Sequence, residues 1–94
     1  MNQRRNIWER VVMEADLPGE TLPGYPLVEI VGEERVLVEN HQGVTAYSCH
    51  EICVKVRYGS LSICGNGLQL ARMSRNQLVV TGRICGVSLH SRRK

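Results

Sequence analysis

The chain has 94 residues and a net charge of +3, which fits one small domain and excludes a catalytic domain joined to a regulatory one. Hydrophobic residues make up 43% of the sequence without any phenylalanine, so the core must consist of Val, Leu and Ile, which favour strands. No apolar run reaches the roughly 20 residues that cross a bilayer, and no signal peptide core is visible, so we expect a soluble, intracellular protein.

The first predicted element is a short amphipathic helix over residues 6–15. Its apolar residues recur at helical spacing, opposite Arg5, Glu9 and Glu14; they are Ile7, Trp8, Val11, Val12 and Ala15. A segment rich in proline and glycine follows, so we divide the chain into helix and linker (1–26), a β domain (27–91) and a basic tail (92–94). Two uses of the helix stay open: capping an open end of the β domain, or docking on a partner or a membrane surface.

Residues 27–91 predict an all-β domain of about seven antiparallel strands, because apolar and polar residues alternate with the period of a strand. The expected strands cover residues 27–31, 35–39, 44–48, 51–58, 60–64, 68–73 and 78–89. Residues 40–43 predict a turn in which Gly43 is free to take a positive φ. The last strand changes parity between Ile84 and Val87, which requires a bulge or tight turn around Gly86.

A faint internal repeat relates residues 51–65 to residues 77–86. Its period of about two dozen residues fits successive hairpins of a sandwich-like or partly rolled sheet, and also the coils of a small β-solenoid. We expect the sheet, with the solenoid as the alternative.

Three motifs in order resemble one known family: RVLVENHQGV at residues 35–44, GSLSICGNGL at 59–68 and LVVTGRI at 78–84. They are similar to the sporulation protein family typified by YabP and YqfC of endospore-forming bacteria. The turn Glu39-Asn40-His41 places the chain closer to the YqfC branch. The similarity covers residues 27–89.

The resemblance implies a non-enzymatic protein of the sporulating cell that is needed for endospore maturation and works beside a larger membrane-embedded sporulation protein. It implies no catalytic residues, no cofactor and no small-molecule substrate. The expected location is the cytoplasm of the sporulating cell, with a peripheral position at the membrane around the forespore as a variant.

The predicted function is therefore that of an accessory or scaffold protein that binds a membrane-anchored partner. Sheet edges offer unpaired backbone groups to a partner strand, and we expect residues 27–31 and the last strand to form the edges. Self-association through the same edges is a close variant. Candidate partner-contact residues are Trp8 on the helix, Val31 and Val36 beside the first turn, and His41 in the turn at 40–43.

The four cysteines give the first alternative function. Without a secretion signal, a disulfide framework is disfavoured. Parity places Cys53, Cys64 and Cys85 on the polar stripe, so their thiols converge if their strands are neighbours, with His50 or His90 as an added ligand. That arrangement would make a metal-binding or redox-sensing domain.

Nucleic-acid binding is the second alternative. It requires Arg57, Arg72, Arg83 and the basic tail to form one patch, yet the basic residues are mostly terminal or scattered, without interleaved aromatics. We expect no nucleic-acid partner.

Overall fold

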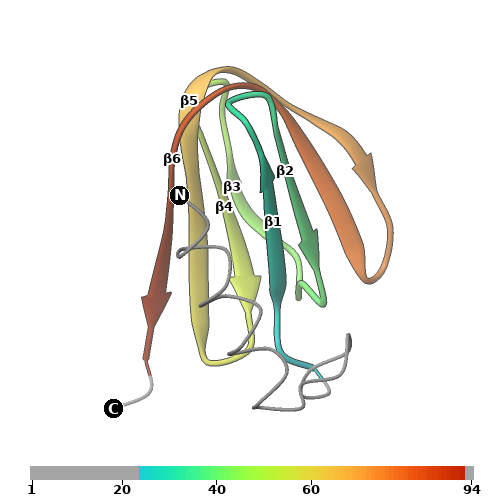
Figure 1. Cartoon of the computed structure of the whole chain (residues 1–94). Helices are drawn as coiled ribbons and strands as arrows, with labels where there is room; N and C mark the ends of the chain where they lie inside the picture. Colours follow the sequence, from blue (N-terminus) through green and yellow to red (C-terminus); the bar gives the residue numbers. More distant parts are fainter. Residues whose placement is uncertain (1–23, 93–94) are drawn as a thin grey trace, which may run out of the picture.

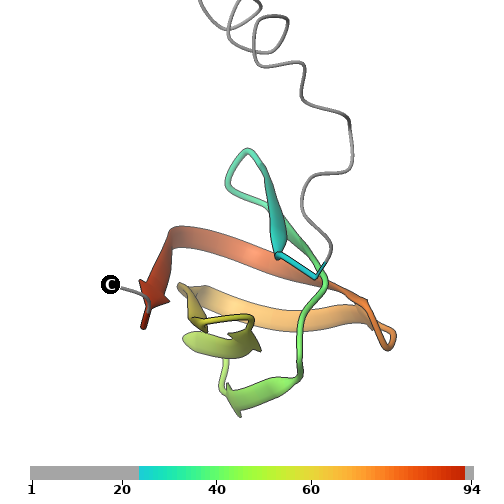
Figure 2. The same cartoon turned by 90° about the horizontal axis from the view of Figure 1, so that it is seen from below.

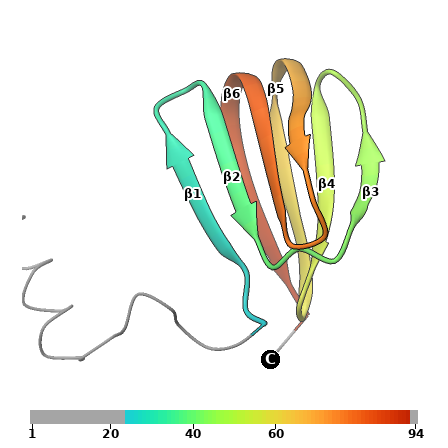
Figure 3. The same cartoon turned by 90° about the vertical axis from the view of Figure 1, so that its right-hand side faces the viewer.

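The computed structural model describes residues 24–92, which form six antiparallel strands in one open sheet (Figures 1 and 3). The strands are β1 (Leu27–Val31), β2 (Arg35–Glu39), β3 (Val44–Tyr47), β4 (Glu51–Val56), β5 (Gly59–Met73) and β6 (Gln77–Ser91). The predicted all-β class is confirmed, while the helix predicted at 6–15 lies outside the described residues. Within residues 24–92, no helix is long and apolar enough to cross a membrane.

The described part of the chain has six strands, so the prediction of seven is wrong. The fifth and sixth predicted strands are one strand, β5, which runs for 15 residues. Residues 65–67 do not form a turn between two strands, because the chain pairs with β6 both before and after them. The register of this pairing shifts between Cys64 and Gly65 and again between Asn66 and Gln69. Together with a third shift between Leu70 and Arg72, these irregularities leave the extra residues of both strands unpaired, and the strand continues.

The long strands β5 and β6 bend midway, so that the two ends of the sheet face each other (Figures 1 and 2). We call the two halves the first and second walls. The first wall contains β1, β2, residues 77–81 of β6 and residues 69–73 of β5. The second wall contains β3, β4, residues 59–64 of β5 and residues 84–91 of β6.

The core fills the space between the walls with aliphatic side chains from both. Alternate residues of each strand point inward, as the sequence pattern predicted. The buried cluster consists of Val36, Val38, Ile52, Val54, Val56, Leu61, Ile63, Leu68, Leu78, Val80 and Ile84.

Gly82 occupies the corner where β6 passes from one wall to the other. Its φ of 135° is a conformation that other residues rarely adopt, and a Cβ at this position would lie 2.7 Å from the Gly67 carbonyl oxygen. The predicted change of parity is also confirmed nearby. Cys64 pairs with Gly86 and Gly65 pairs with Ile84, which leaves Cys85 as an extra residue.

The strand pairing tests two further predictions. Strand β6 is central over residues 77–81, where it lies between β2 and β5, but its residues 84–91 pair only with β5, so this half of the last strand is an edge, as predicted. The edges of the first wall are β1 and residues 69–73 of β5, and those of the second wall are β3 and residues 84–91 of β6. Every strand pair is antiparallel, which rules out the solenoid.

Residues 40–43 form the connection from β2 to β3 and therefore cross between the two walls. Three backbone hydrogen bonds join this connection to the turn before β6 and to β4. Asn40 N–H donates to Asn76 O (2.6 Å), Gln42 N–H to Lys55 O (2.7 Å), and Lys55 N–H to Gly43 O (2.8 Å). Gly43 has a φ of 121°, which confirms its predicted positive φ.

Candidate functional site

Strand β1 is an exposed edge with apolar side chains on both of its faces. It pairs only with β2, so the backbone groups on its other side have no strand partner within residues 24–92. Ile30 lies opposite the buried Val36 and therefore faces the core side, yet it is 53% exposed. Leu27 and Val31 point to the other face and are 45% and 46% exposed. An edge of this kind is a template for strand pairing.

Strand β3, an edge of the second wall, is shorter and less regular. Its pairing with β4 shifts between Val44 and Ala46, and a shift of this kind disrupts the ladder that an added strand would extend. Tyr47 is exposed, but its hydroxyl accepts a hydrogen bond from the Leu70 N–H of β5 (3.4 Å). Of β1 and β3, β1 is the more regular and the more apolar.

Two of the four predicted partner-contact residues are buried. Val36 is completely buried in the core because it lies on the inward face of β2, so its predicted contact with a partner is wrong. Val31 lies on the edge and is exposed, and Trp8 lies outside the described residues. Of the predicted set, the structure therefore leaves Val31 available at the edge.

His41 is a link inside the fold, with 8% of its surface exposed. Its Nε2 lies 2.9 Å from Ser74 O, and the Gly43 N–H donates to its Nδ1 (3.0 Å). Since a carbonyl only accepts, these partners assign the proton to Nε2. The predicted contact of His41 with a partner is corrected: its ring joins the β2–β3 connection to the turn between β5 and β6.

The cysteines do not form the metal site of the first alternative function. Among residues 24–92, which include all four cysteines and all three histidines, no group of three or more His, Cys, Asp or Glu side chains is placed to hold a metal ion. All four cysteines are free; Cys53 is half-buried, 3.7 Å from the Ser62 hydroxyl, while Cys64 and Cys85 are exposed at the bend. The strands of Cys53, Cys64 and Cys85 are neighbours, but their three thiols do not form such a group in residues 24–92.

The basic residues considered for nucleic acid lie in different parts of the fold. Arg57 belongs to the turn between β4 and β5, where its guanidinium carbon lies 5.2 Å and 5.1 Å from the ring centres of Tyr25 and Tyr58. Arg72 lies near the end of β5 and Arg83 next to the corner of β6. The aromatic contacts of Arg57 fix the entry of the chain into β1, a role that its sequence position did not reveal.

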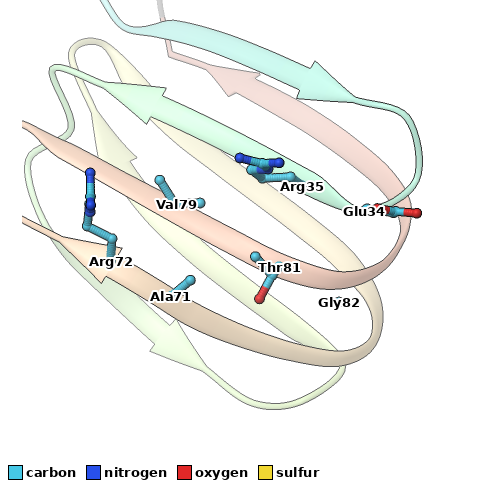
Figure 4. A pocket seen from close by; sticks show the side chains of 7 residues that line it. All are labelled: Glu34, Arg35, Ala71, Arg72, Val79, Thr81 and Gly82. Carbon is cyan, nitrogen blue, oxygen red and sulfur yellow. The ribbon is translucent and has the colours of Figure 1, made fainter.

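A shallow open groove lies on the first wall, on the side away from the core (Figure 4). Arg35 of β2 and Arg72 of β5 flank the central strand β6, which contributes Val79 and Thr81 to the floor. The alternation of β2 indicated that this face is partly apolar, because Leu37 points away from Val36 and Val38. The arginine pair was missed, since it depends on the order of strands that are distant in sequence.

Comparisons with known proteins agree with the predicted resemblance. The YabP family model matches residues 26–94. The chain is also 24% identical to the uncharacterized protein YqfC of Bacillus subtilis (strain 168) over 85 residues, which cover 89% of this chain and 91% of that protein. No solved structure gives a significant match. Because the family model spans all six strands, the chain belongs to the YabP family of sporulation-associated proteins.

Proposed function

We propose that this protein is an accessory component of sporulation that binds a membrane-anchored partner by adding a strand of that partner to β1. The observation that carries the proposal is the exposure of β1 on both faces. A helix packed on the sheet would cover only one face, either Leu27 and Val31 or Ile30. An added strand pairs with the unpaired backbone groups of β1 and places its side chains next to Leu27 and Val31 on one face and next to Ile30 on the other.

The charge at the centre of β1 favours a different chain over a second copy as the partner. Two copies of β1 in full antiparallel overlap would pair Leu27 with Val31 of the other copy and Glu29 with Glu29. Like charges directly opposite each other destabilise a strand pair, by up to about 1 kcal/mol. A partner strand with Lys or Arg opposite Glu29 turns this repulsion into attraction, so we infer an apolar segment with a basic residue at its centre.

Capture of partners from sporulating cells tests this proposal. Wild-type bait should recover a membrane protein of the sporulation programme, and Ile30→Lys and Val31→Lys should lose it, because a lysine on an edge strand opposes pairing. Ser62→Lys is the matched control, since Ser62 lies on β5 where that strand pairs with both β4 and β6. Recovery of no such protein, together with normal heat-resistant spores after deletion of the gene, contradicts the proposal.

A further inference from the structure

The second wall has an open edge along the C-terminal half of β6. Residues 86–91 pair with β5 on one side, and no strand within residues 24–92 lies on their other side (Figure 1). The turn between β1 and β2 bonds to β6 just before this stretch, where the Ile84 N–H donates to Glu33 O (2.7 Å). The open edge therefore begins after Ile84.

The backbone groups of Val87 and Leu89 point away from β5 at this edge. The Arg92 N–H donates to Tyr58 O of the β4–β5 turn (2.7 Å), so residue 92 directs its backbone groups toward that side of the sheet. In an antiparallel pair this direction alternates from residue to residue, and the register with β5 is unbroken over residues 86–91. The N–H and C=O groups of Val87 and Leu89 are therefore directed at the position of an added strand.

The same two residues carry apolar side chains on the core face of the wall. Leu89 lies opposite Leu61 and Val87 opposite Ile63, and both of these partners are buried. Leu89 is nevertheless 62% exposed, the largest exposed fraction among the large apolar residues of the described chain, because it lies at the open edge. An added strand with an apolar residue opposite Leu89 would cover it.

This edge lacks the features that protect the other edges from pairing. Charged side chains, short strands and irregular registers are the usual protection of a sheet edge. Strand β1 carries Glu29, residues 69–73 of β5 contain Arg72 and a register shift, and β3 is short and shifted. Residues 86–91 contain no Asp, Glu, Lys or Arg, and their register is continuous. Such an edge is typical of a strand that pairs with another chain.

We propose that residues 86–91 of two copies of this chain pair in antiparallel orientation, so that their second walls form one continuous sheet. With the twofold axis at Ser88, Val87 of each copy lies opposite Leu89 of the other, and the backbone groups that point away from β5 are paired. No carboxylate, ammonium or guanidinium group lies within this pairing, whereas two copies of β1 would bring Glu29 against Glu29. The pattern of this edge is thus complementary to itself.

This contact goes beyond the proposed function and does not use β1. Because β1 is an edge of the first wall, each copy in the dimer keeps its own β1 available to a membrane-anchored partner. A dimer that binds two such partners would be held more firmly than a single chain, through the effective concentration of the second site. A single strand pair is a small contact, so we expect a dissociation constant of roughly micromolar order, and dilute solutions contain the single chain.

Sedimentation velocity over a range of protein concentrations tests the dimer. The wild type should change from monomer to dimer as its concentration rises. Leu89→Lys should raise the dissociation constant at least about tenfold, because the substitution occurs in both Val87–Leu89 pairs of the dimer. Val31→Lys is the matched control, since Val31 is also an exposed apolar residue of an edge strand, but in the first wall. It should dimerise like the wild type.

A second variant tests the backbone pairing itself. Leu89→Pro removes an N–H that points away from β5, and proline is tolerated at an edge position of this kind. Its far-ultraviolet circular dichroism should therefore match the wild type, while the dimer is lost. A wild type that stays monomeric far above micromolar concentration, or a dimer that persists in both Leu89 variants, overturns the proposal. Capture of the membrane partner by Leu89→Lys bait should continue, which separates this test from that of the proposed function.

Discussion

Replacement of His41 by alanine should remove the side-chain link between the β2–β3 connection and the β5–β6 turn. Ser74 O would lose its donor and the Gly43 N–H its acceptor, in a region where the ring itself is 8% exposed. Two hydrogen bonds at about 1 kcal/mol each and the loss of a buried ring lower the free energy of unfolding by about 3 kcal/mol. That is a large fraction of the roughly 5 to 14 kcal/mol expected for a domain of this size.

Thermal and urea unfolding followed by circular dichroism measure this loss. The melting temperature should fall by about 12 to 24 °C, at 4 to 8 °C per kcal/mol. In His41→Asn, the side-chain amide places an acceptor near the position of Nδ1, and in His41→Gln it places a donor near the position of Nε2. Each variant should therefore be more stable than His41→Ala. His50→Ala is the control, because His50 is exposed and its side chain has no hydrogen bond with the described residues. A change below about 0.5 kcal/mol for His41→Ala, the usual effect of a surface substitution, would refute this reasoning.

Three further predictions test the packing, the corner and the thiols. Leu61 and Leu89 are directly paired, but 2% and 62% exposed, so Leu61→Ala should cost about 2 to 5 kcal/mol in urea unfolding and Leu89→Ala less than about 0.5; equal costs would contradict the assigned core. Gly82→Ala should destabilise the fold more than Gly43→Ala, because both glycines have a positive φ but only Gly82 has backbone atoms close to the position of a Cβ. Equal falls in the melting temperature of the two variants in differential scanning calorimetry would contradict the crowding at Gly82. In the native protein, a thiol reagent should modify Cys53 more slowly than the three exposed cysteines, and peptide mass spectrometry that finds uniform rates would disprove its partial burial.

The strands were largely predictable because side-chain alternation is a local property. The bounds of β1 and β2 agree with the predicted ranges, and the change of parity near Gly86 indicated a real bulge at Cys85. Each of these features depends on residues that are close in sequence, so no knowledge of strand order was needed.

The remaining features depend on pairing between distant residues. Gly65-Asn66-Gly67 is compatible with a turn and with a bend, and only the pairing of Gln69 with Thr81 across the corner makes β5 continuous. The edges were assigned without strand order, which is why β3 was missed. The burial of Val36, a candidate partner-contact residue, was missed for the same reason, since the covering wall comes from strands later in the chain.

The bent pair of β5 and β6 also constrains the order in which the sheet can assemble. Strand β2 pairs with residues 77–81, about forty residues further along the chain, so during synthesis it has no β6 to join until the C-terminal part has emerged. Until then, the hairpin of β1 and β2 lacks the strand that joins it to the rest of the sheet. We therefore expect an early folding unit made of β3, β4 and residues 59–64, and late docking of the N-terminal hairpin. Such a late step leaves the first hairpin open to association with other chains for the longest time.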